Sequence, residues 1–211
     1  EDAVDHYEDV LGTYLVKLRA KALSREDNRT INTLLHTLND LERISAHSVN
    51  LLKAGQEIQE KSIHFSHEAI DDLSVLEAAV QDIVTRTVDA FQKYDCYAAG
   101  KIEPLEQVVD GLVREVKTRH IARLQAGACT IEYGFVLDDL LTNYERIADH
   151  CSNIADAMIE VSEDRFDTHE YLNHIKNGES PSFEKRYERY RGRYTFEPGP
   201  SGTAAAPEQK K

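Results

Sequence analysis

ERIADHCSN, residues Glu145–Asn153, is the stretch of sequence that decides the fold, because it repeats ERISAHSVN, residues Glu42–Asn50. Five of the nine positions are identical, and the two copies are 103 residues apart. The spacing Glu-x-x-x-Asp also occurs in both halves, beginning at Glu1 and at Glu106. A repeat of this length indicates a duplicated structural unit, and each half is too small to bury its own core completely.

Hydrophobic residues recur every three or four positions throughout the first 160 residues, which is the spacing of amphipathic helices, and no segment alternates as a strand would. The first 160 residues contain one Pro, as long helices require. The sequence therefore predicts an all-α fold, an elongated helical bundle. We expect helices at residues 2–23, from the turn at 24–27 to 59, and at 66–94, 104–124 and 130–161.

The repeat and the composition together predict three regions. The first repeat is expected at residues 1–96 and the second at 97–178, with residues 166–175 as the candidate for a short or incomplete third helix. Residues 179–211 are expected to form an irregular tail, because four of the five prolines lie there. Its aromatic segment suggests a short extended or helical arm packed on the bundle, and the last dozen residues are expected to be disordered.

The net charge of −13 comes entirely from residues 1–160, because residues 161–211 contain nine basic and nine acidic residues. An acidic body is repelled by nucleic-acid phosphates and by anionic lipid headgroups. Cations or a basic protein surface are the better partners. The three cysteines form no CxxC pair, which argues against a zinc–thiolate site and favours a reducing compartment.

No apolar run approaches the ~20 residues that would span a bilayer, and no signal peptide is recognisable. The chain has no initiator Met, and its first residues already have a helical pattern. We therefore expect a soluble fragment or a processed chain that begins just inside a helix.

The repeated acidic residues are the candidate metal ligands. Acidic residues four apart lie on one helix face, so two such pairs on neighbouring helices would place four carboxylates around one point. A bound cation would remove their repulsion, and carboxylate oxygens suit Mg, Mn, Fe or Zn. An exposed acidic face is the usual explanation of a single pair, but the duplication favours a site. The expected ligands in the second repeat are Glu106, Asp110, Glu145 and Asp149.

Basic residues next to these carboxylates could orient them or neutralise their charge. These are Arg146 and His150 in the second repeat and Arg43 and His47 in the first. Either histidine could instead have a purely structural role.

The Glu-Arg-Ile-x-Asp-His-x-x-Asn segment, paired with Glu-x-x-x-Asp on the preceding helix, resembles the signature of the PhoU family. The resemblance covers residues 1–162. It implies two three-helix repeats and a role in regulating phosphate uptake and signalling, and some members of the family carry iron or zinc clusters on the carboxylate motifs. The first repeat has Ala46 where the family has Asp, so a site built from Glu1, Asp5 and Glu42 is expected to be weak or absent.

The segment YEDVLGTYLVKL at residues 7–18 and the Tyr-rich tail are most similar to the PhoU-like domains of bacterial sodium-dependent phosphate cotransporters. This resemblance implies a regulatory domain on the cytoplasmic side of the membrane, as part of a membrane protein. Its partner would be a membrane phosphate transport domain in the same parent chain, and a homo-oligomer is left open.

Two other functions compete with this one. The first alternative is a free-standing adaptor that binds a sensor kinase or an uptake complex. The second, less favoured, is a carboxylate-bridged dimetal enzyme, whose usual Glu-x-x-His motif is absent because Glu145 and His150 are five residues apart. No nucleophile–base arrangement or glycine-rich phosphate loop is recognisable, so we expect no catalytic residue.

Overall fold

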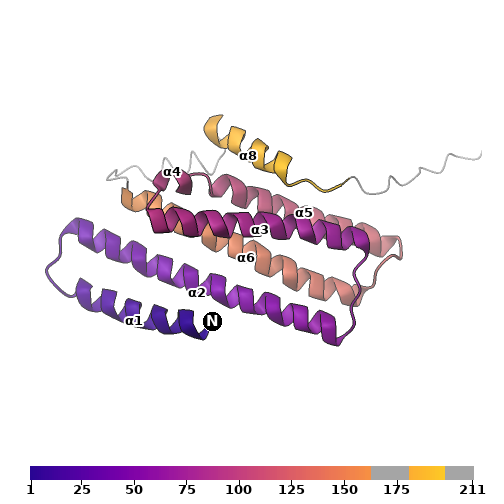
Figure 1. The fold of residues 1–211 in the computed structure, drawn as a ribbon, viewed down its shortest axis with the longest axis horizontal. Helices are drawn as coiled ribbons and strands as arrows, with labels where there is room; N and C mark the ends of the chain where they lie inside the picture. Colours follow the sequence, from indigo (N-terminus) through magenta and orange to yellow (C-terminus); the bar gives the residue numbers. More distant parts are fainter. Residues whose placement is uncertain (163–180, 198–211) are drawn as a thin grey trace, which may run out of the picture.

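The computed structural model describes residues 1–162 and 181–197, and every regular element within these residues is a helix. The helices form an elongated bundle (Figure 1), so the predicted all-α bundle is confirmed. The longest of them, α2 with 36 residues and α6 with 32, span about 54 and about 48 Å at ~1.5 Å per residue. In chain order the helices are α1 (Asp2–Arg19), α2 (Arg25–Glu60), α3 (His67–Lys93), α4 (Cys96–Ala99), α5 (Glu103–Gln125), α6 (Ile131–Ser162) and α8 (Pro181–Arg193).

The helix ends follow signals in the local sequence. Ser24 begins α2 with a capping box, in which its hydroxyl accepts from the Asp27 amide and the Asp27 carboxylate accepts from the Ser24 amide. The Ser66 hydroxyl accepts from the Ala69 amide at the start of α3. Gly127 follows α5 with a φ of 70°, a conformation that glycine adopts without strain.

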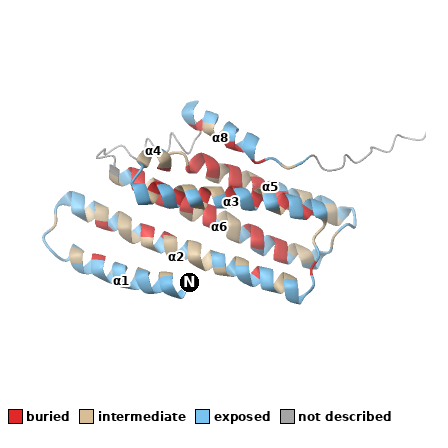
Figure 2. Cartoon of the chain, viewed as in Figure 1, coloured by how far each residue is buried: buried red, intermediate tan, exposed pale blue. Residues whose placement is uncertain are grey.

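The hydrophobic core lies mainly between α3, α5 and α6, whose buried residues stand out in Figure 2. α6 packs against α2, α3 and α5, whereas α1 packs on α2 and is mostly exposed. None of the described helices has the length and apolar character that crossing a bilayer requires. The core residues with the least exposure are mostly Leu, Ile and Val: Leu76, Ile83, Ile102, Leu105, Val109, Val116, Leu137, Leu141 and Ile154.

Two local features differ from the sequence-based expectations: α1 ends at Arg19 rather than at residue 23, and the short helix α4 was not expected. The expected arm in the tail is helical: residues 181–193 form α8, which packs on α5 and buries Phe183 and Tyr190. The candidate helix at residues 166–175 and the last dozen residues lie outside the described part of the chain.

A buried cluster of ion pairs and hydrogen bonds connects α3, α5 and the segment after α8. The Asp72 carboxylate, 3% exposed, accepts hydrogen bonds from Arg119 at 3.1 Å and from Arg123 at 2.7 Å. Arg119 also donates to the Glu197 carbonyl at 3.0 Å, and its guanidinium lies 4.7 Å from the centre of the Phe196 ring. One α3 carboxylate thus holds two α5 arginines in place, and one of these contacts the C-terminal segment.

Replacing Asp72 with Ala is expected to lower the free energy of unfolding by about 3 to 5 kcal/mol, because two partly buried guanidinium groups lose their carboxylate. Chemical denaturation followed by circular dichroism measures this loss. The matched control is Asp89→Ala, which removes an exposed α3 carboxylate 3.0 Å from Lys93 and should cost less than about 1 kcal/mol. Equal losses in both variants would contradict a special role for Asp72.

Candidate metal centre

The repeated segments meet where α2 packs against α6. The rings of His47 and His150 stack there, with their centroids 5.6 Å apart and an interplanar angle of 27°. His47 Nδ1 lies 2.8 Å from Asn143 Oδ1, and His150 Nδ1 donates to Asp40 Oδ1 at 2.9 Å. Asp40 and Asn143 are themselves 103 residues apart. The duplicated residues therefore make equivalent contacts in the folded chain: His47 on α2 bonds to a residue of α6, and His150 on α6 bonds to a residue of α2.

The histidines lie at the α2–α6 contact. The sequence left two roles open for His150 and His47, orienting the carboxylates or a structural role, and here His150 bonds to Asp40 and stacks on His47. Asp40 also accepts from the Asn153 amide at 3.4 Å. Reasoning from the sequence missed Asp40 and Asn143, although their spacing of 103 residues was a signal that could have found them.

Three of the four predicted ligands come together between α5 and α6. One oxygen from each of Glu106, Asp110 and Asp149 lies within 4.8 Å of the other two, and all three residues are partly buried. Within the described part of the chain, no other group of three or more His, Cys, Asp or Glu side chains has this geometry. Arg146 donates to Asp149 Oδ2 at 3.1 Å.

The electrostatics of Asp110 show that the carboxylates repel one another. Burial raises the pKa of the Asp110 carboxyl above its ordinary value, and the negative charges of Glu145 and Asp149 raise it further. Arg114 opposes this shift. The fourth predicted ligand, Glu145, thus acts on Asp110 through its charge although it lies outside the close group.

One further observation favours a metal ion at these carboxylates. Asp110 Oδ1 is buried and has no hydrogen-bond partner within the described part of the chain. A buried carboxylate oxygen without a partner is costly, and a cation would supply the missing interaction. Oxygen donors of this kind suit Mg²⁺, Mn²⁺ and iron, and they also bind Zn²⁺.

The carboxylates of the first repeat do not form an equivalent group. Glu1 and Asp5 are exposed on α1, and Glu42 forms an ion pair with Arg43 at 3.4 Å. Ala46 stands where the second repeat has Asp149, so one donor is missing. Within the described residues these three carboxylates fall outside any group with metal-ligand geometry.

Glu103 is a buried carboxylate next to this group, and reasoning from the sequence did not identify it. It is 9% exposed, and it accepts a short hydrogen bond from the Ser152 hydroxyl of α6. Its charge contributes to the raised pKa of Asp110. The contact ties the start of α5 to α6 near the candidate ligands.

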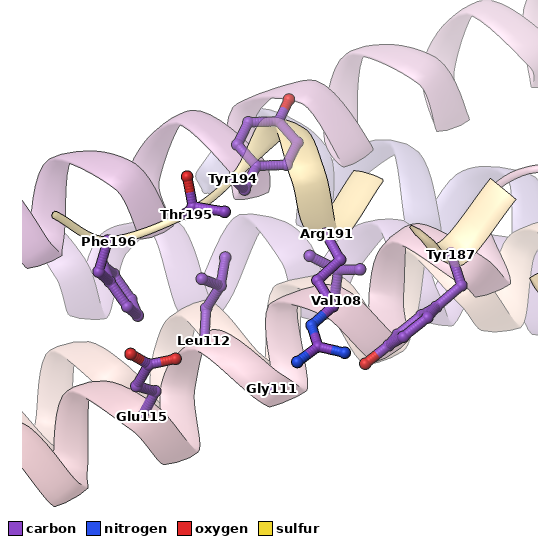
Figure 3. Close-up of a pocket in the computed structure, with 9 residues that line it drawn as sticks. All are labelled: Val108, Gly111, Leu112, Glu115, Tyr187, Arg191, Tyr194, Thr195 and Phe196. Atoms are coloured by element: carbon purple, nitrogen blue, oxygen red, sulfur yellow. The ribbon is translucent and has the colours of Figure 1, made fainter. Parts of the chain in front are cut away.

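A separate cavity of about 420 Å³ lies between α5 and α8. Figure 3 shows the side chains of Val108 and Leu112 from α5 facing the same space as Tyr187, Arg191 and Phe196. None of the candidate metal ligands lines it. This cavity arises from the packing of α8 on α5.

Comparison with known proteins agrees with this architecture. Residues 73–158 match the family model described as the PhoU domain. The phosphate-specific transport system accessory protein PhoU homolog 1 of Thermotoga maritima is 25% identical over 150 residues, which are 71% of this chain. The match spans 63% of that relative's length. The crystal structure of PhoU from Pseudomonas aeruginosa superimposes with a TM-score of 0.71 and 22% identity, covering 76% of this chain and 77% of that one.

These findings define a helical bundle with the PhoU fold. The stretch that is similar to the PhoU domain, residues 73–158, contains the carboxylate group of α5 and α6. That stretch begins in α3 and ends in α6, so it crosses the expected boundary between residues 96 and 97. The division of the chain at this boundary stays a prediction.

The raised pKa of Asp110 predicts the direction of a pH effect. A carboxyl whose pKa is higher in the folded than in the unfolded state lowers the free energy of unfolding as the pH rises above its unfolded value, and this loss is complete above the folded value. In metal-free protein, Asp110→Asn should therefore raise the melting temperature at pH 7. This gain should shrink as the pH falls from the raised pKa of Asp110 to the ordinary carboxyl value, and it should be absent below that value.

Thermal melts between pH 3 and pH 7 after treatment with a chelator measure the effect. The control is Asp139→Asn, which changes an exposed carboxylate on α6 and should leave the melting temperature nearly unchanged. A metal-free Asp110→Asn protein that is less stable at pH 7 would show that the carboxylates do not repel one another.

Proposed function

We propose that this chain is a PhoU-type regulator of phosphate transport that acts by binding other proteins. The observation that carries the proposal is the match of residues 73–158 to the PhoU domain, in the part of the bundle that holds the carboxylate group. The similarity to an accessory protein of a phosphate-specific transport system supports the same role.

Two forms of this regulator fit the sequence. The chain could be the regulatory domain of a sodium-dependent phosphate transporter, located at the cytoplasmic face of the membrane, or a free-standing adaptor that binds an uptake complex or a sensor kinase. The curated relative is an accessory protein by name, which supports the adaptor at least as well as the transporter domain. Membrane-spanning helices encoded upstream of Glu1 in the same reading frame would favour the transporter domain.

We also propose that Glu106, Asp110 and Asp149 hold a metal ion, with Glu145 adding negative charge beside them. The metal would supply positive charge between α5 and α6, where the carboxylates otherwise repel one another. Arg146 would fix the orientation of Asp149. Metal binding would then favour the packing of α5 against α6 over any arrangement that separates them.

Added Mn²⁺, Fe²⁺ or Zn²⁺ is expected to raise the melting temperature of the metal-free protein. A ligand at 100 times its dissociation constant stabilises the native state by about 2.7 kcal/mol. Asp149→Ala should abolish this stabilisation and lower the bound metal measured by mass spectrometry. Asp139→Asn, an exposed carboxylate on the same helix, should retain both. Identical metal content and stabilisation in the two variants would refute the site.

Uptake of radiolabelled phosphate tests the regulatory role. Cells that lack this chain should differ from parent cells in the rate of uptake or in its response to external phosphate. Restoring the unaltered chain or the Asp139→Asn variant should return uptake to the parent level. If metal occupancy controls the regulator, Asp149→Ala should restore it only in part. Unchanged uptake and unchanged regulation in cells without the chain would count against the proposed function.

A further inference from the structure

A basic cavity lies between α3, α4 and α8, and no residue of the carboxylate group lines it. Its volume is about 340 Å³, within the ~300–1,000 Å³ typical of small-ligand sites. Figure 1 shows α8 on the side of the bundle where α4 and α5 lie. The lining residues are five cations and two tyrosines, with no carboxylate among them: Arg86, Tyr97, Lys101, Arg186, Arg189, Tyr190 and Arg193.

The α8 side of the cavity is one stripe of that helix. Arg186, Arg189, Tyr190 and Arg193 have the spacing of residues that share a helix face. An adjacent face of α8, with Tyr187 and Arg191, lines the cavity of Figure 3 against α5. Two different cavities thus use two faces of one short helix, and the arginine stripe lines the one shared with α3 and α4.

A basic arm on an acidic protein would be expected to lie over carboxylates. Here the stripe faces Arg86 of α3 and Lys101, which follows α4. Like charges around a common space repel one another, and the cost falls when an anion occupies that space. The acidic character of residues 1–160 does not remove this preference, because at physiological salt charges farther away than about 8 Å are largely screened.

Neighbouring groups compensate only part of the positive charge. Asp82 pairs with Arg86 at 2.9 Å and with Arg193 at 3.4 Å, and it accepts a hydrogen bond from Tyr194 at 2.8 Å. A single carboxylate is therefore shared between two of the five cations. Within the described residues, neither Lys101 nor Arg189 has a carboxylate partner.

Other contacts position two of the cations, Lys101 and Arg186, at the wall of the cavity. Lys101 Nζ lies 4.0 Å and the Arg186 guanidinium 5.5 Å from the centre of the Tyr97 ring. Arg186 also donates to the Gly100 carbonyl at 2.7 Å. These contacts orient the side chains before any ligand binds, and pre-organised arginine and lysine are the usual groups that recognise phosphate.

We propose that this cavity binds a small anion that carries two or more phosphate groups, such as an inorganic polyphosphate or a nucleoside polyphosphate. Five cations around a volume larger than one orthophosphate needs favour several linked phosphates over one. The concave shape favours a small ligand over a membrane surface. This site is independent of the proposed metal centre, with which it shares no residue.

Isothermal titration with sodium tripolyphosphate tests the proposal on metal-free protein, so that chelation contributes no heat. One ion should bind per chain. The variant Lys101→Gln/Arg189→Gln should bind about tenfold more weakly or worse, because both replaced residues line the cavity. The control Lys185→Gln/Arg191→Gln removes the same charge from residues outside it and should change the affinity less than about twofold. Circular dichroism and thermal melts check that both variants fold.

Several outcomes separate the alternatives. ATP binding at the same site would place the ligand among nucleotides, and binding of tripolyphosphate alone would place it among inorganic polyphosphates; either supports the proposal. No binding, an equal loss in both variants, or orthophosphate binding as tightly as tripolyphosphate would overturn it. It would also be overturned if tripolyphosphate did not bind and vesicles of phosphatidylglycerol bound in a way that required Lys101 and Arg189.

Discussion

Helix α6 is packed on several sides, because α2, α3 and α5 all lie against it. Toward α3 and α5 it presents apolar residues such as Leu137, Leu141 and Ile154, which are at most 2% exposed. Burial on this scale is the main favourable contribution to folding. It fixes the rotation of α6 about its axis, and the rotation determines that Asp149 turns toward α5 while the adjacent His150 turns toward α2.

The carboxylate group forms because apolar packing holds α5 and α6 together although their carboxylates repel one another. Glu106 and Asp110 on α5 and Asp149 on α6 approach one another, and the raised pKa of Asp110 reflects the electrostatic cost. A purely structural ion network would be expected to place a cation against the buried Asp110 oxygen, as Arg119 and Arg123 do for Asp72. Asp110 has no such partner in the described part of the chain. This contrast between two acidic residues is the reason to regard the α5–α6 group as a binding site.

The sequence predicted the helices well because their apolar period is a property of each segment alone. It also pointed to three carboxylates that the fold brings together, Glu106, Asp110 and Asp149, since residues four apart share a helix face and the duplication indicated which faces to compare. It could not predict which helix each polar residue meets. His150 was assigned to the carboxylates because the two are neighbours in sequence, but consecutive helix residues are about 100° apart around the axis. Sequence reasoning missed the basic cavity for a related reason. Its cations come from α3, from Lys101 between α4 and α5, and from α8, and only the folded chain brings them together.

Helix α8 connects the basic cavity to α5, the helix that carries two of the candidate metal ligands. Arg186, Arg189, Tyr190 and Arg193 of α8 line the basic cavity. The helix also packs on α5, which carries Glu106 and Asp110. Its hold on the rest of the bundle includes Arg186 bonded to the Gly100 carbonyl and Tyr194, just after α8, bonded to Asp82. An anion that bridges α8 and α3 would favour the docked position of α8, and a metal ion would favour the present position of α5 against α6. Each ligand would influence the other only so far as its affinity differs between the docked and undocked positions of α8.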